Sequence, residues 1–275
     1  MSTLPIRLVS AAVAVAILFL TRAYLQEVGL FIVTGIIVLL ALKEFSSFFS
    51  TDIRKDTFFR ILFFSVGAVV FLSSYYSQTI LLASFWSAST ILIIYLLLKI
   101  RKEEDREVVF RNQCLAVVGL LYCSVSPALT AQVLFLFENG SGWFLTVLAI
   151  VFFGDGFAMF AGYFFGKRKL TPLISPKKTW AGAVGGIFGS VLFGCLFSYW
   201  FLDGVSLVEI GWIAAVTGCC GQFGDLFESL AKRVAGVKDT GNIMPGHGGI
   251  LDRIDGVLFS GPVFYYLVKL MHFSS

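Results

Sequence analysis

Acidic side chains recur at helical spacing in two segments near the end of the chain. The residues are Asp225, Glu228 and Ser229 in the first segment, and Asp252 and Asp255 in the second. Spacings of three and four residues place side chains on one face of a helix. Carboxylate oxygens suit Mg²⁺, which takes one or two of them and leaves other positions for phosphate oxygens. We therefore expect the two segments to converge on one divalent cation. The alternative is that they form surface ion pairs with neighbouring Lys and Arg residues.

A glycine-rich connector joins the two acidic segments. It reads Gly241-Asn-Ile-Met-Pro-Gly-His-Gly-Gly249, and its glycines allow backbone N–H groups to approach a phosphate closely. The spacing differs from that of the Walker A motif, which excludes an ordinary P-loop. His247 is compatible with three roles: a general base, a group that stacks on a nucleotide base, or a structural hydrogen-bond donor.

A basic stretch, residues 166–179, carries five cations within twelve residues. Pro172 and Pro176 interrupt it, so we expect an irregular loop at the membrane surface and not one regular helix. The hydroxyl and ammonium groups just before the next apolar segment are those of Ser175, Lys177, Lys178 and Thr179. Such groups beside a helix N-terminus favour a phosphate site. The alternative is a surface anchor that attracts anionic lipid.

Asp155 lies inside an apolar stretch, VFFGDGFAMFAGYFFG. A carboxylate in a membrane segment is costly, so it is a candidate for function, here in substrate binding. The alternative is a structural, hydrogen-bonded aspartate.

The composition places these groups in a membrane protein. The chain has 275 residues, of which 57% are hydrophobic and 14% charged, whereas a soluble domain carries about 25% charged residues. Apolar segments lie near residues 5–21, 27–42, 58–73, 78–98, 113–136, 143–165, 180–202, 207–222 and 256–272. We predict an all-α, polytopic integral membrane protein with about nine transmembrane helices. It would be a single membrane domain, 1–275, with N-terminal helices in 1–142 and the catalytic half in 143–275.

The basic residues predict the orientation of these helices. Counting the N-terminus as the first loop, 19 of the 21 Lys and Arg residues lie on every second loop. This bias indicates that the N-terminus and the large polar loops face the cytoplasm and the C-terminus the other side. No small-x-small cleavage site follows the first apolar run, which favours an uncleaved helix over a signal peptide. We expect an inner (plasma) membrane protein with a cytoplasmic site. The net charge of +4 gives no indication of a nucleic-acid partner.

Residues 229–255 resemble the C-terminal signature of phosphatidate cytidylyltransferases, also called CDP-diacylglycerol synthases. That signature is a Ser, Lys-Arg, Lys-Asp, His-Gly-Gly and Asp-Arg-hydrophobic-Asp at fixed spacings. The matching residues are Ser229, Lys232, Arg233, Lys238, Asp239, His247, Gly248, Gly249, Asp252, Arg253, Ile254 and Asp255. The specific resemblance extends over roughly residues 143–265. Met159 departs from it, because many members carry Tyr there.

The resemblance implies a reaction of CTP with phosphatidate that gives CDP-diacylglycerol and pyrophosphate. It also implies Mg²⁺, held by Asp225 and Asp252, and leaves room for a monovalent cation such as K⁺. The catalytic candidates are Asp225, Asp252, Asp255, Lys232, Arg233 and His247. The substrate-binding candidates are Ser175, Lys177, Lys178, Thr179, Lys238, Asp239, Gly248, Gly249, Arg253 and Asp155. Membrane lipid and a second copy of the chain, as a homodimer, are the further candidate partners.

Two other functions remain open from the sequence. A CTP-dependent kinase of lipid alcohols would share the membrane setting and release CDP. A transporter would predict repeated halves with polar residues at the membrane midplane, whereas the charged residues here cluster at one end of the C-terminal half.

Overall fold

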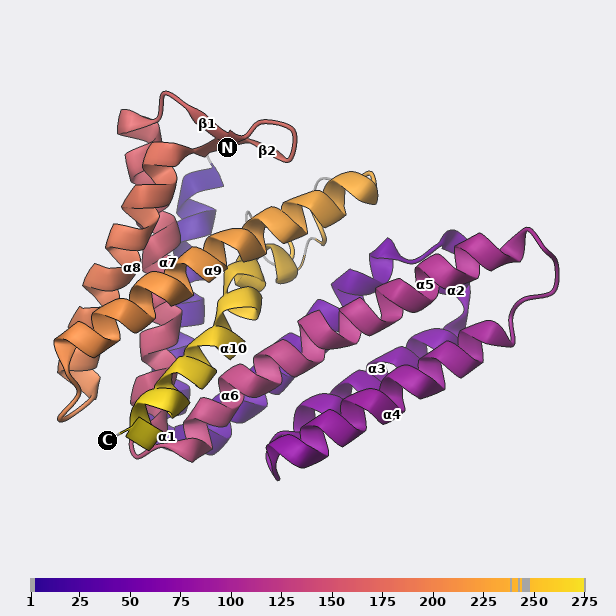
Figure 1. The fold of residues 1–275 in the computed structure, drawn as a ribbon, viewed down its shortest axis with the longest axis horizontal. Helices are drawn as coiled ribbons and strands as arrows, with labels where there is room; N and C mark the ends of the chain where they lie inside the picture. Colours follow the sequence, from indigo (N-terminus) through magenta and orange to yellow (C-terminus); the bar gives the residue numbers. More distant parts are fainter. Residues whose placement is uncertain (1–2, 238, 242, 244–247, 275) are drawn as a thin grey trace.

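A computed structural model describes residues 3–237, 239–241, 243 and 248–274, and its described elements are helices with one small hairpin (Figure 1). The helices of the N-terminal half are α1 (Thr3–Phe45), α2 (Thr51–Lys55), α3 (Thr57–Ser73), α4 (Gln78–Leu97), α5 (Asp105–Leu120) and α6 (Ser126–Leu136). Short 3-10 (Ser46–Phe48) and π-helical (Leu121–Val125) turns follow α1 and α5. The C-terminal half holds α7 (Gly140–Phe165), β1 (Lys169–Thr171), β2 (Ser175–Thr179), α8 (Trp180–Phe201), α9 (Leu207–Val234) and α10 (Leu251–Ser274).

The expected all-α membrane protein is confirmed. Seven helices in the described part of the chain are long and apolar enough to cross a membrane. The apolar segments 5–21 and 27–42 form two arms of α1, separated by a kink at Gln26, where φ is 52°. The segment 58–73 lies in α3, which is too short to count among the seven. The number of crossings, about nine, and the cytoplasmic N-terminus stay predictions.

Helix α9 extends well beyond the apolar segment that predicted it. The segment ended at residue 222, but the helix runs on to Val234. Asp225, Glu228 and Ser229 are therefore helical, as their spacing predicted.

Close packing holds α7, α8 and α9 together, because glycines lie where the helices approach each other. A Cβ atom at Gly182 of α8 would be 2.8 Å from the carbonyl oxygen of Ala158 on α7. A Cβ atom at Gly186 would be 2.8 Å from Nε2 of Gln222 on α9. These helices, together with α10 against α9, surround the site described below.

The expectation of an irregular loop at 166–179 is wrong. Strands β1 and β2 pair antiparallel, with Lys169 opposite Thr179 and Thr171 opposite Ser175. Pro176 is tolerated in β2 because a strand of a two-stranded ribbon has an unpaired edge. The Thr179 side chain accepts a hydrogen bond from the Gly182 amide at 3.1 Å and so caps α8.

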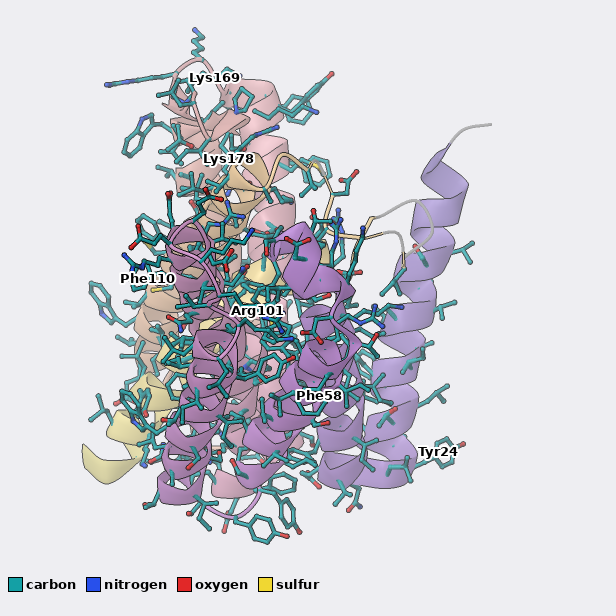
Figure 2. The ribbon with its side chains drawn as sticks, turned by 90° about the vertical axis from the view of Figure 1, so that its right-hand side faces the viewer. Tyr24, Phe58, Arg101, Phe110, Lys169 and Lys178 are labelled. Carbon is teal, nitrogen blue, oxygen red and sulfur yellow. The ribbon has the colours of Figure 1, made fainter. Side chains whose placement is uncertain are left out.

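The hairpin and the C-terminus lie at opposite ends of the molecule (Figure 1). Figure 2 shows Lys169 and Lys178 at the hairpin end and Tyr24, which precedes the kink in α1, at the other end. This arrangement agrees with the alternation of basic and non-basic loops in the sequence.

Candidate active site

A cavity of about 860 Å³ opens among α7, the hairpin, α8, α9 and α10. Its charged and polar lining consists of Asp155, Lys169, Lys177, Lys178, Thr179, Gln222, Asp225, Glu228, Lys232, Asp239, Asp252, Arg253 and Asp255. All of these residues belong to the C-terminal half. The cavity therefore brings the basic hairpin and both acidic segments to one place.

Some predicted site residues lie elsewhere. Ser175, Ser229, Arg233, Gly248 and Gly249 are not among the residues that line the cavity. Arg233 is exposed, and Ser229 donates a hydrogen bond to Asp225, which lines the cavity. Lys238 and His247 fall outside the described residues.

Lys178 connects the hairpin to α9. Its Nζ lies 2.7 Å from Asp225 Oδ2 and donates to the carbonyl oxygen of Gln222 at 3.3 Å. The other oxygen of Asp225 accepts from the Ser229 hydroxyl at 3.3 Å, which matches their i, i+4 spacing. Gln222 in turn donates to the Ala183 carbonyl oxygen on α8. Lys178 thus points into the site, whereas Lys177 is exposed.

Lys232 connects the two acidic segments. Its Nζ lies 3.3 Å from Glu228 Oε2 and 2.6 Å from Asp252 Oδ1. The side chains of Glu228 and Asp252 are only 1% and 4% exposed, so these are buried ion pairs and not the surface pairs of the alternative interpretation. Removing one partner of a buried pair leaves the other charge uncompensated, which costs about 3–5 kcal/mol.

Asp252 is bonded on both carboxylate oxygens. Oδ1 pairs with Lys232, and Oδ2 accepts from the amide of Gly249 at 2.9 Å and from the amide and hydroxyl of Thr240, each at 3.0 Å. The Gly249 amide, which the sequence suggested for phosphate, is engaged within the protein. Asp252 therefore holds Thr240 and Gly249 together as well as lining the cavity.

Asp155 of α7 and Asp255 of α10 both line the cavity, and these two helices are in contact. The position of a Cβ atom at Gly256 would be 3.7 Å from Asp155 Oδ2, and the Gly256 amide donates to Asp255 Oδ1 at 2.8 Å. Tyr122, from the π-helical turn, donates to the Asp255 carbonyl oxygen at 3.4 Å. Asp155, Asp255 and Gly256 come from the C-terminal half, and Tyr122 adds a contact from the N-terminal half.

The donor chemistry of the cavity fits a divalent cation. Six carboxylates line it, and the buried Glu228 makes no hydrogen bond in the described part of the structure beyond its ion pair with Lys232. Within the same described residues, however, no three carboxylate, histidine or cysteine side chains are arranged to hold a metal ion. Instead, Asp225 and Asp252 each pair with a lysine. The lysines supply the positive charge that these carboxylates require.

Sequence reasoning missed three polar residues around this site: Glu44, Gln222 and Thr240. Glu44 follows Lys43 at the end of an apolar run. Its charge beside that run was the only feature of the sequence that could have marked it as a site residue. Its partners lie about 200 positions further along the chain. No local pattern could have identified them.

The fold and the site define a helical membrane protein with a cavity lined by cations and carboxylates. The chain matches the sequence model of the cytidylyltransferase family over residues 5–271. It belongs to that family, which confirms the resemblance of its C-terminal signature.

Individual relatives give the same result. The chain is 36% identical over 174 residues to the phosphatidate cytidylyltransferase of Thermotoga maritima, an alignment that covers 62% of this chain and 64% of that protein. It is 32% identical over 278 residues to the phosphatidate cytidylyltransferase of Staphylococcus aureus strain COL, with 96% of this chain and 98% of that protein covered. With the enzyme of the same name from Rickettsia bellii it shares 37% identity over 162 residues, covering 55% and 68% of the two chains.

Proposed function

We propose that the protein is a phosphatidate cytidylyltransferase, which makes CDP-diacylglycerol and pyrophosphate from CTP and phosphatidate. The observation that carries the proposal is the cavity that brings hairpin cations together with the carboxylates of α9 and α10. Two phosphorylated substrates bring several negative charges together, and such a reaction needs mainly positioning and charge neutralisation. The family membership and the named relatives support this assignment.

The proposed reaction is a displacement at the α-phosphorus of CTP. A phosphate oxygen of phosphatidate forms the new bond to this phosphorus, while the bond to the bridging oxygen of the β-phosphate breaks. Pyrophosphate leaves with the electron pair. Lys178, Lys177 and Arg253 line the cavity and would bind phosphate oxygens, since ammonium and guanidinium groups form strong charge-assisted hydrogen bonds.

Asp225 and Asp252 are the residues that we propose to hold Mg²⁺, with Glu228 and Asp255 beside them. The bound cation would supply charge neutralisation on the phosphates. Lys178 and Lys232, which now pair with Asp225 and Asp252, could then turn their ammonium groups toward substrate.

We further propose that the cavity faces the cytoplasm from the inner (plasma) membrane. The bias of 19 of the 21 basic residues toward alternate loops supports this orientation. A cysteine introduced at Ser175 should resist an impermeant thiol reagent added to intact cells. Labelling from outside would contradict the proposal and place the hairpin on the outer side of the membrane.

The test of the function is an assay of the purified protein in mixed micelles with phosphatidate, Mg²⁺ and CTP labelled at the α-phosphate. We expect the label to enter the lipid and pyrophosphate to be released. A kinase of lipid alcohols would instead label no lipid and release CDP, with diacylglycerol as acceptor. Absence of lipid label with folded protein would refute the proposal.

Lys177 and Lys178, the two lysines of β2, should differ in their effects. Lys178→Ala should lower kcat/KM for CTP by about ten- to a hundredfold, because a lost charge-assisted hydrogen bond is worth about 1.5–3 kcal/mol and Asp225 also loses its partner. Lys177 lines the cavity but makes no ion pair among the described residues, so Lys177→Ala should cost less. Lys167→Ala is the control, because Lys167 is exposed and is not among the residues that line the cavity. Wild-type kinetics for both hairpin variants at low substrate would make the hairpin a lipid anchor only.

A further inference from the structure

Glu44, in the last turn of α1, has its carboxylate buried against the start of α10. The residue is 5% exposed. Its Oε1 accepts from the Ile250 amide at 3.0 Å, and its Oε2 accepts from the Leu251 amide at 2.8 Å. These amides stand where α10 begins. The N-terminal half thus provides the acceptor for the first turn of the helix that carries Asp252 and Asp255.

No lysine or arginine pairs with Glu44 among the residues that the structure describes. A buried carboxylate without a cation is costly unless hydrogen bonds compensate for lost water. Here the compensation comes from the unpaired N–H groups and the positive end of α10. The same contacts hold the start of α10 at one position relative to α1.

Thr240 links Glu44 to the cavity. Its hydroxyl lies 3.1 Å from Glu44 Oε2 and 3.0 Å from Asp252 Oδ2, and its amide donates to the same Asp252 oxygen. A hydroxyl carries one hydrogen, so it can donate fully to only one of the two carboxylates. Thr240 is therefore held between a carboxylate of the N-terminal half and a carboxylate of the cavity.

Gly241 and Gly249, at the two ends of the connector, pack against this arrangement. A Cβ atom at Gly241 would overlap the carboxylate of Glu44, and one at Gly249 would overlap both that carboxylate and the Thr240 hydroxyl. Glycine is thus required at both positions by the close approach to Glu44, whatever else the connector binds.

We infer that Glu44 is a positioning residue for catalysis, which orients Asp252 through Thr240 and the first turn of α10. The inference rests on the proposed function. It gives a residue of α1, which lies outside the family signature at 229–255, an effect on the turnover rate.

The substitution Glu44→Gln tests this role with little change of shape. The two side-chain oxygens face different backbone N–H groups, those of Ile250 and Leu251. Whichever way the amide is turned, its NH₂ group meets one of these donors, so a hydrogen bond is lost and the first turn must shift. A displacement of about 1 Å can cost about a hundredfold in rate. We expect kcat to fall about ten- to a hundredfold. The KM for CTP should change by less than about threefold, because the cavity cations keep their places.

Thr240 provides a second test that does not depend on Glu44→Gln folding. Thr240→Val removes the hydroxyl that lies between the carboxylates, so it should also lower kcat. Thr240→Ser keeps the hydroxyl, so its kcat should stay near the wild-type value. Glu209→Gln is the matched control. It removes one carboxylate from the first turn of α9, where the side chain is exposed and outside the cavity, and its kcat should stay at the wild-type value.

The experiment combines steady-state kinetics with amide hydrogen exchange of the full-length protein in micelles. In Glu44→Gln, the peptide that contains Gly249, Ile250 and Leu251 should exchange faster than in wild type and in Glu209→Gln. An unchanged kcat or unchanged exchange in this variant overturns the inference, provided that the wild type is active. Should Glu44→Gln not fold, wild-type kcat in Thr240→Val overturns it. An inactive wild type instead refutes the proposed function.

Discussion

Asp225→Asn should lower kcat by at least about a hundredfold, with much less effect on the folded structure. Asn preserves the shape and can still accept the hydrogen bond from Ser229. It removes the negative charge that pairs with Lys178 at 2.7 Å and that a reluctantly dehydrating Mg²⁺ requires. The loss should appear mainly in turnover, because the proposed metal acts on charge that develops in the transition state.

Steady-state kinetics across a Mg²⁺ titration measure this effect. Asp203→Asn is a suitable control, since Asp203 is an exposed aspartate that does not line the cavity. If Asp225→Asn keeps activity within about threefold of wild type with an unchanged Mg²⁺ requirement, the metal is held elsewhere.

Asp252→Asn should be at least as harmful to kcat and should also loosen the connector. The Asp252 carboxylate accepts on both sides, from Lys232 on Oδ1 and from Thr240 and Gly249 on Oδ2. The NH₂ group of Asn would face donors in either orientation. A buried donor left without an acceptor costs about 1–3 kcal/mol, and Lys232 loses one of its two carboxylate partners.

The two variants can therefore be told apart by a readout other than activity. Asp252→Asn should raise hydrogen exchange at Thr240 and Gly249 and lower the melting temperature. Asp225→Asn should leave exchange at these amides near the wild-type level, because none of them bonds to Asp225. Equal hydrogen exchange in both variants would show that Asp252 does not hold Thr240 and Gly249 in place. A near-normal kcat for Asp252→Asn would show that Asp252 is not needed to bind the metal.

The local chemistry of the site could be predicted because it depends on short spacings. Asp225, Glu228 and Ser229 lie on one face of α9, as the i, i+3, i+4 pattern indicated, and the Ser229 hydroxyl reaches Asp225. The low charge content predicted a membrane protein, and the described chain contains seven helices suited to crossing. Predictions failed where turn geometry mattered. Pro172 and Pro176 suggested an irregular loop, whereas the chain pairs Lys169–Thr171 with Ser175–Thr179 as strands.

Composition thus indicated the membrane class, short spacings indicated the candidate groups, and the signature at 229–255 gave the resemblance to the family. Only the tertiary structure decided how those groups pair: Lys178 with Asp225, Lys232 with both Glu228 and Asp252, and Glu44 with the start of α10. Spacing along a helix fixes which side chains share a face, because the backbone geometry is local. Contacts such as that of Glu44 with Leu251, 207 positions apart, depend on how whole helices pack, and the sequence near either residue carries no record of that packing.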